Sequence, residues 1–206
     1  MIGIDQIKQT INIMLHPKSA TATPKGVKEN FVWYYKLAVV PLIISILISV
    51  ILFGIVGSVS SLFGLNNLLP GVGFTAAIVV LVVILYFLIF IPAGFLIGAA
   101  ILHFFGKHVF RKFKEDYAHT LTAIVYESAP AVMLFWLYLI PVVGEILMFI
   151  VGIWNLVIYF YALSNQQKIS KLAVLGITIG VWLIGLLLVF VIVMLFAAGS
   201  ALAFPR

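Results

Sequence analysis

The residue that could most plausibly do chemistry is a carboxyl group placed where ionisation is costly. Glu127 is the one acidic residue well inside a long apolar run, nine positions after Ala118. At a helical rise of about 1.5 Å per residue, it would lie roughly 14 Å deep, near the middle of a hydrocarbon core of about 30 Å. A carboxyl group at that depth must be protonated, paired or in contact with water.

The neighbours of Glu127 form the stretch most typical of a functional site. Tyr126, Glu127, Ser128 and Pro130 lie close together, and Pro130 lacks the N–H that would bond the carbonyl of Tyr126, which predicts a kink. Asn155 lies at a similar depth on the next apolar run, so a hydrogen bond to Glu127 is geometrically feasible. Two interpretations stay open: a proton, cation or lipid-headgroup site inside the bundle, or a protonated Glu127 that locks two helices together.

A second group of chemically active residues lies between two apolar runs. Lys107, Arg111, Lys112 and Lys114 alternate with aromatic residues. This pattern is typical of a segment held at an anionic membrane surface by charge and by aromatic insertion. The histidines and acidic residues nearby match no metal-ligand spacing, and we expect neither a metal nor a cofactor.

The composition excludes most classes of protein. Only 9% of the 206 residues are charged, whereas 65% are hydrophobic. A soluble domain, a disordered chain and a cytosolic enzyme are all excluded, because none could cover or avoid so much apolar surface. The chain has no cysteine, which rules out disulfides and thiolate catalysis.

The apolar runs predict an all-α polytopic membrane protein, since long helices satisfy their own backbone groups in lipid. The second run is longer than the hydrocarbon core, so it must tilt, project or kink near Pro92. A turn at Pro141–Gly144 is short enough to make the third and fourth runs an antiparallel hairpin. Residues 1–36 form a cytoplasmic lead, and residues 37–206 form a domain of five transmembrane helices at about 37–57, 74–105, 118–140, 145–163 and 172–198.

The basic residues predict the orientation of these helices. Eleven of the twelve Lys and Arg residues fall in three segments that an odd–even count of spans places on one side: the N-terminal lead, the loop between spans two and three, and the loop between spans four and five. The positive-inside rule then predicts a multi-pass protein of the cell membrane with a cytoplasmic N-terminus and an external C-terminus. The net charge of +6 is therefore a topology signal, and we expect no nucleic-acid partner.

The N-terminal lead predicts a short amphipathic helix. Its apolar residues share one helical face, although Ile13 departs from the pattern; the shared face comprises Ile4, Ile7, Ile11, Met14 and Leu15. Such a helix lies on the cytoplasmic membrane surface or packs on the protein's own spans. We expect residues 16–30 to form a polar linker. The aromatic and basic cluster Trp33–Lys36 is typical of residues at the level of the lipid headgroups.

Several motifs together resemble those of the Yip1 family of multi-pass membrane proteins, and they cover nearly the whole chain. They are the lead-in Met14-Leu15-His16-Pro17 followed by Trp33-Tyr34-Tyr35; Phe105-Gly106 with Phe113, Tyr117 and Thr120; Tyr126 with Pro130; and Trp154 with Ser164–Lys171. The resemblance implies a five-helix integral membrane protein. Eukaryotic members of the family resemble trafficking factors that engage small GTPases at the Golgi and endoplasmic reticulum.

This chain departs from the trafficking members, because its cytoplasmic lead is only 36 residues long and holds no Asp-Leu-Tyr-Gly-Pro segment. The departure argues against small-GTPase binding. We expect a compact, prokaryotic-type, non-enzymatic member that organises membrane or binds a membrane partner, with anionic lipids on its cytoplasmic face and a second copy or another membrane protein as partner. The alternative is a small protein that translocates a proton, an ion or a lipid by means of Glu127.

Overall fold

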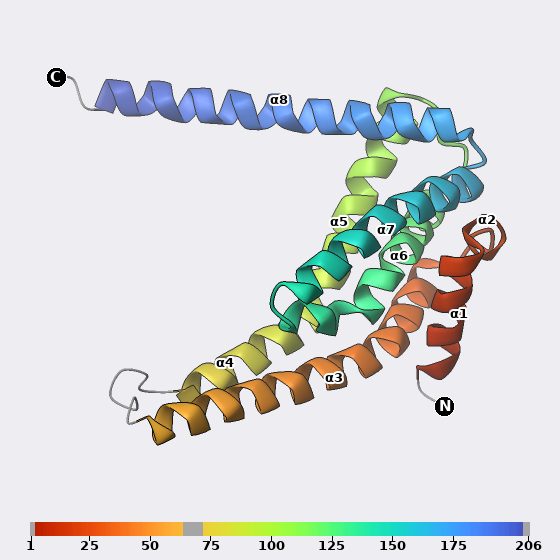
Figure 1. Ribbon diagram of the computed structural model, residues 1–206. Coiled ribbons are helices and arrows are strands. Elements are labelled where there is room, and N and C mark those ends of the chain that lie inside the picture. The colour runs from red at the N-terminus through yellow and green to blue at the C-terminus, as the bar shows by residue number, and fades with distance from the viewer. Residues whose placement is uncertain (1–2, 64–71, 204–206) are drawn as a thin grey trace.

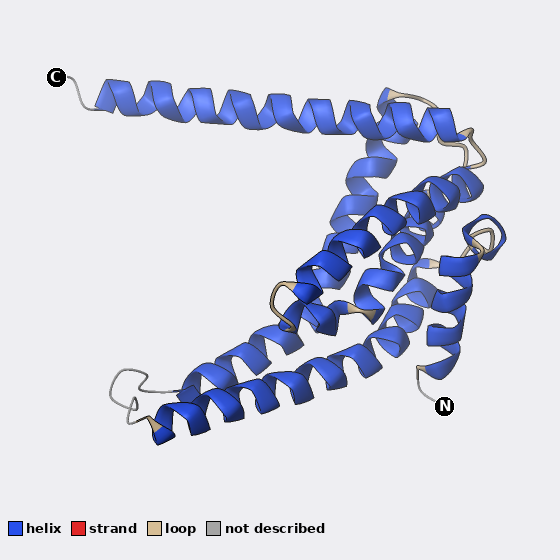
Figure 2. Ribbon diagram, in the orientation of Figure 1, coloured by secondary structure: helices blue, strands red, loops and turns tan. Residues whose placement is uncertain are grey.

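The structure is a helical bundle from which two long apolar arms extend (Figure 1). The computed structural model describes residues 3–63 and 72–203, and every regular element in those ranges is a helix (Figure 2). In chain order the elements are α1 (Ile4–Leu15), α2 (Pro17–Ala20), α3 (Val27–Leu62), α4 (Val72–Leu85), the π-helix η2 (Tyr86–Phe90), α5 (Ile91–Phe104), the π-helix η3 (Phe105–Val109), α6 (Tyr117–Met133), the 3₁₀-helix η4 (Phe135–Leu139), α7 (Val143–Gln167) and α8 (Lys171–Ala203).

Four of the described helices are long and apolar enough to cross a membrane: Val27–Leu62, Thr75–Val109, Val143–Gln167 and Lys171–Phe196. The chain is thus an all-helical protein with several potential spans. The second of these joins α4, η2, α5 and η3 into one interrupted helix. α6 has 17 residues, and together with η4 it covers most of the third expected span, 118–140.

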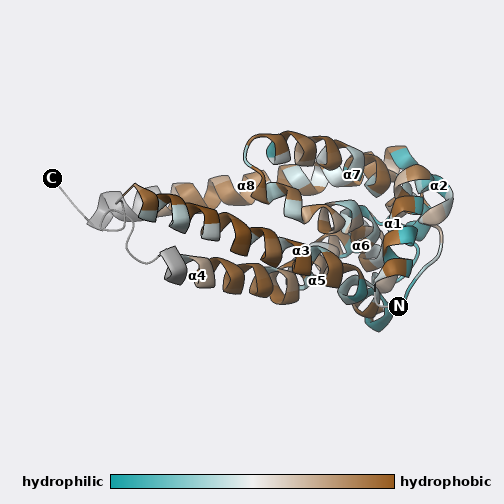
Figure 3. Cartoon of the chain, turned by 60° about the horizontal axis from the view of Figure 1, so that its bottom comes forward, coloured by the Kyte–Doolittle hydropathy of each residue, from teal (hydrophilic) through white to brown (hydrophobic). Residues whose placement is uncertain are grey.

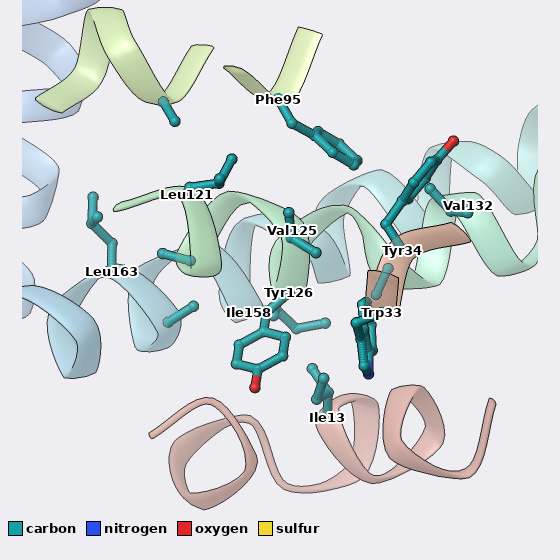
Figure 4. Packing of buried hydrophobic residues seen from close by; sticks show 14 of the residues in the cluster. Ile13, Trp33, Tyr34, Phe95, Leu121, Val125, Tyr126, Val132, Ile158 and Leu163 are labelled. Carbon is teal, nitrogen blue, oxygen red and sulfur yellow. The ribbon is translucent and has the colours of Figure 1, made fainter. Parts of the chain in front are cut away.

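α6 is the centre of the core, and nine of its residues are buried. It packs along α7 and also against α3 and α5. Leu121 and Val125 on α6 meet Ile158 and Leu163 on α7 in one cluster (Figure 4). Burial on several sides explains why the helix that carries Glu127 is less hydrophobic than the helices that face outward.

The N-terminal lead folds back onto the bundle, which corrects the linker expected at residues 16–30. Pro17–Ala20 forms α2, and α3 begins at Val27 and not at Leu37. The early start has a local cause, because Glu29 Oε2 accepts the N–H of Gly26 at 3.0 Å and so satisfies a free donor at the helix N-terminus.

α1 uses the residue that spoiled its expected pattern. Ile13 is fully buried in the core, whereas Ile4, Ile11 and Leu15 stay exposed. The Nε1–H of Trp154 on α7 donates to the carbonyl of Met14 at 3.0 Å. α1 therefore packs on the protein with one face and leaves a second apolar face open.

Part of the aromatic cluster at the start of α3 belongs to the core, whereas Tyr35 and Lys36 stay exposed. Trp33 is 6% exposed and Tyr34 is 1% exposed. The Tyr34 hydroxyl donates to the carbonyl of Phe87 at 2.6 Å, and the Tyr35 hydroxyl donates to that of Leu88 at 3.1 Å.

These two hydroxyls replace donors that Pro92 cannot supply. A helix would bond the N–H of residue 92 to Leu88, and a π-turn would bond it to Phe87, but proline has no N–H. The helix is π-wound immediately before this point, where the N–H of Ile91 reaches the carbonyl of Tyr86. The expected interruption near Pro92 is thus a π-segment whose free carbonyls α3 satisfies.

The turn between η4 and α7 is tight. Val142 has φ 64° and ψ −61°, and the N–H of Val143 donates to the carbonyl of Pro141 at 2.7 Å. These values define a γ-turn of the strained kind. Gly144 is required beside it, because a Cβ there would overlap the carbonyl oxygen of Leu137.

The two arms point away from the core. The far half of α3 pairs with α4, and α8 runs alone beyond its first turns (Figure 1). Both arms are apolar over their length, whereas hydrophilic residues gather at the opposite end, around α1, α2 and the ends of α5 and α7 (Figure 3). The bundle therefore has one polar end.

Candidate functional site

The Glu127 side chain lies in a shallow hollow between four helices. The hollow has a volume of about 270 Å³ and is lined by Leu102 of α5, Ile124 and Glu127 of α6, Leu156 and Tyr159 of α7, and Thr178, Val181 and Trp182 of α8. Ser128 Oγ donates to Glu127 Oε2 at 3.1 Å. Across the hollow, the hydroxyls of Tyr159 and Thr178 lie 2.9 Å apart. The Glu127 carboxyl group and the hydroxyls of Tyr159 and Thr178 thus share an otherwise apolar hollow, and the Ser128 hydroxyl bonds the carboxyl group from outside its lining.

Asn155 does meet Glu127, but at its backbone. With its amide turned to donate, the Asn155 side chain reaches the carbonyl of Glu127 at 3.2 Å and that of Val151 at 3.3 Å. The bond joins α7 to the backbone of α6 and leaves the carboxyl group of Glu127 free for Ser128. The expected pairing of the two residues is therefore a helix-to-helix contact rather than a charge partner.

Tyr126 and Pro130 do not belong to the Glu127 hollow. Consecutive helical residues are turned by about 100°, so Tyr126 points to the other side of α6. Its side chain is fully buried, and its hydroxyl donates to the carbonyl of Thr23 at 3.1 Å (Figure 4). Pro130 is buried in the core, and α6 ends three residues later at Met133. The residues expected to form one site therefore lie in two places: Glu127 lines the hollow, whereas Tyr126 and Pro130 lie in the core.

A buried polar network at the polar end escaped the sequence analysis. The Thr122 hydroxyl donates to the carbonyl of Lys25 at 3.0 Å and accepts from Asn30 Nδ2 at 2.9 Å. Gln167 Nε2 donates to Thr120 Oγ1 at 2.9 Å, and Gln166 Nε2 donates to the carbonyl of Thr21 at 2.7 Å. The sequence signal for this network is the pair Gln166 and Gln167 at the end of α7. Two amides are too polar to face lipid, and the apolar residues around them make a water-exposed position unfavourable.

The basic loop is anchored by its aromatic residues to the protein and not to lipid. Phe113 is buried over Gly106, where a Cβ would come within 2.5 Å of the ring. The ring of Phe110 presses on Gly180 of α8, and the Tyr117 hydroxyl donates to the carbonyl of Leu96 at 3.0 Å. These contacts correct the expected aromatic insertion. The four basic side chains, Lys107, Arg111, Lys112 and Lys114, are all exposed.

The acidic residues of this loop are each paired with a basic side chain. Glu115 Oε1 lies 2.6 Å from Lys168 Nζ, and Asp116 Oδ1 lies 2.8 Å from His119 Nδ1. The hydrogen bond from Lys168 lowers the pKa of Glu115, and the bond from His119 lowers the pKa of Asp116. Among the described residues, no three His, Asp or Glu side chains converge on a point that could hold a metal ion.

Comparison with known proteins adds the family. No curated protein and no solved structure matches the chain. The family model described as the Yip1 domain matches residues 11–193, a range that contains α6, the basic loop and most of both arms. With several apolar helices able to span a membrane, this chain belongs to the Yip1 family of multi-pass membrane proteins.

Proposed function

We propose that this protein is a non-enzymatic member of the family that organises membrane or binds a membrane partner through its arms. The observation that carries the proposal is the exposure of α8. Trp182 is 69% exposed and Leu186 is 62% exposed, although both would lie within the hydrocarbon core of a spanning helix. A helix with this much bare apolar surface is in contact with lipid or with another helix.

We further propose five crossings with the polar end in the cytoplasm of a cell-membrane protein. At about 1.5 Å per residue in α6 and about 2 Å in η4, the two segments together would reach roughly 35 Å, enough for the third crossing. The three segments that hold eleven of the basic residues gather at the polar end (Figure 3). That placement supports a cytoplasmic N-terminus by the positive-inside rule; Arg206 at the proposed external end lies outside the described residues.

Anionic lipids on the cytoplasmic face are the proposed partners of Lys107, Arg111, Lys112 and Lys114. All four side chains are exposed, and the ion pairs found among residues 3–63 and 72–203 involve none of them. Each basic residue near such a surface contributes about 1 kcal/mol of attraction. The loop would therefore hold the polar end of the bundle against the headgroups.

A photoreactive residue placed on α8 tests the proposal. We expect benzoylphenylalanine at position 186 to form an adduct of discrete mass in native membranes, with a second copy, another membrane protein or lipid. The same residue at position 158, which is buried between α6 and α7, is the matched control and should form none. Failure of position 186 to form an adduct above that control would contradict the proposal.

The Glu127 hollow favours one alternative, the translocation of a proton, an ion or a lipid. A carboxyl group that shares a hollow with two hydroxyls and bonds a third is a chemically suitable relay. Proteoliposomes with a pH-sensitive dye inside test the case of a proton: translocation predicts proton flux that Glu127→Gln abolishes. Glu145→Gln, at the exposed start of α7, removes the same charge elsewhere and should leave such flux intact. The organising role predicts no flux in any of the three proteins.

A further inference from the structure

A second hollow lies at the polar end, between α1 and the start of α3. Its volume is about 520 Å³, and it is lined by Gln6 of α1, by Lys25 just before α3, and by Lys28, Glu29, Val32, Trp33 and Lys36 of α3. Residues 28, 32 and 36 recur at every fourth position and so form one face of the helix. The hollow is thus a groove along the first turns of α3, with α1 as its other wall.

The Lys25 side chain lines the groove, and its ammonium group is buried in the wall without a hydrogen-bond partner. Its Nζ lies 4.2 Å from the ring centroid of Trp33 and 4.5 Å from that of Tyr126, and it is buried. The two ring faces attract the cation, but they leave its N–H donors unpaired. Burial lowers the pKa of Lys25 to about 8, against the opposing effect of Glu29.

Gln6 contributes a second buried polar atom without a partner. Its Oε1 accepts no hydrogen bond. The wall of the groove therefore holds one unpaired charged donor and one unpaired neutral acceptor. A buried polar group without a partner is unfavourable, and more so when it is charged, so both are groups that a ligand would satisfy.

The charge of the groove selects an anion. Three lysines face a single carboxylate, and Glu29 Oε2 is already occupied by the N–H of Gly26 at 3.0 Å. The ion pairs of the described ranges include neither Lys25, Lys28 nor Lys36. An anion in the groove would supply the counter-charge that Glu29 alone does not.

The groove also lies at the right height for a lipid headgroup. α3 has 36 residues, which at about 1.5 Å each exceeds the hydrocarbon core by roughly 24 Å, so its first turns project into the headgroup layer. Lys36 is the last charged residue before the apolar run that starts at Leu37. Gly3, with φ 86°, lets the start of α1 approach α3 closely here, since a Cβ there would lie 2.9 Å from the carbonyl oxygen of Lys36.

We propose that this groove binds the phosphodiester headgroup of an anionic lipid, with Lys25, Lys28 and Lys36 around the phosphate and Gln6 Oε1 accepting a headgroup hydroxyl. The site is distinct from the basic loop between η3 and α6 and from the arms. The proposal of this site does not depend on the proposed function.

Native mass spectrometry of the full chain in detergent tests the site. The ligands are phosphatidylglycerol, phosphatidylcholine with the same acyl chains, and inorganic phosphate, each titrated separately. We expect phosphatidylglycerol to bind more tightly than the other two, and Lys25→Met to weaken it by about 10- to 100-fold, the worth of one hydrogen bond to a charged group. Lys8→Met is the matched control on the exposed face of α1 and should leave the affinity within about twofold.

Other outcomes overturn the proposal in part or in whole. An unchanged affinity in Lys25→Met refutes the site. Inorganic phosphate that binds as tightly as phosphatidylglycerol, and loses affinity in Lys25→Met, refutes the lipid as the source of the phosphate.

A second pair of variants keeps the proposal testable if Lys25→Met does not fold. Lys25→Arg should retain binding within several-fold, because the guanidinium group keeps both the charge and the ring contacts. Gln6→Leu should erase the preference for phosphatidylglycerol over phosphatidylmethanol, which has the same phosphodiester and no hydroxyl. A preference that survives Gln6→Leu refutes the role of Gln6.

Discussion

Lys25 gives the proposed headgroup site a pH dependence. The rings of Trp33 and Tyr126 face its ammonium, and the charged groups that share its groove are Lys28, Glu29 and Lys36. Burial outweighs Glu29 and lowers the pKa of Lys25 to about 8. An anion binds the protonated form, so affinity is full below that pKa and falls as the pH rises through it.

We therefore expect the affinity for phosphatidylglycerol to fall by about tenfold between pH 7 and about pH 9, as the fraction of protonated Lys25 falls. Native mass spectrometry or a vesicle-binding assay across this range measures it. In Lys25→Arg the dependence should disappear, since the guanidinium group stays charged. An equal dependence in both proteins would show that another group titrates.

At the level of single residues, sequence reasoning identified positions better than partners. Glu127 could be found because a lone acidic residue in an apolar run is conspicuous, and Asn155 because the hairpin places it at a similar depth. Which atoms of Asn155 and Glu127 meet could not be predicted, because it depends on the rotation of α6, which presents a backbone carbonyl to Asn155. Lys25 escaped notice because its ring partners come from two other helices.

Among the elements, the interrupted second span depends on Tyr34. In Tyr34→Phe the carbonyl of Phe87 loses its donor inside the core, at a cost of about 1–3 kcal/mol. We expect the thermal unfolding midpoint in detergent to fall by several degrees. Tyr35→Phe removes the same kind of bond from the carbonyl of Leu88 at an exposed position, so its midpoint should change less. Equal shifts in the two variants would contradict the stated role of Tyr34.

The turn before α7 stores strain that a single substitution should release. Val142 is β-branched and has a positive φ, a combination that costs about 1–3 kcal/mol. Val142→Gly should raise the unfolding midpoint, whereas Gly144→Ala should lower it, because the added Cβ meets the carbonyl of Leu137. Thermal melts of both variants beside the unsubstituted protein test this. A midpoint lowered by Val142→Gly would refute the strain.

The positions at which the helices begin and end show which part of the fold the local sequence pattern predicts. Apolar runs predict where long helices lie, since lipid permits few alternatives. They do not predict that α3 starts at Val27, because that start rests on Glu29 and on contacts with α1 and α6. The π-segment before Pro92 depends in the same way on hydroxyls supplied by another helix.

For the whole molecule, the number of membrane crossings decides on which side of the membrane each end of α7 lies. The two ends of α7 lie on opposite sides of the membrane. Which end is external depends on whether α6 with η4 crosses the membrane or stays within one leaflet. With five crossings Glu145 is external and Ser170 is cytoplasmic; with four, the two exchange sides. Both residues are exposed, so each can report its side.

The absence of cysteine makes this measurable without background. We expect a membrane-impermeant maleimide to label Glu145→Cys in intact cells and to label Ser170→Cys only after permeabilisation. Leu62→Cys, at the exposed far end of α3, should be labelled from outside under either count and calibrates the assay, and Lys112→Cys should be protected under either count. Labelling of Ser170→Cys in intact cells, with Glu145→Cys protected, would establish four crossings. It would also place Lys168 and Lys171 on the outer face, against the charge rule that orients the remaining basic residues.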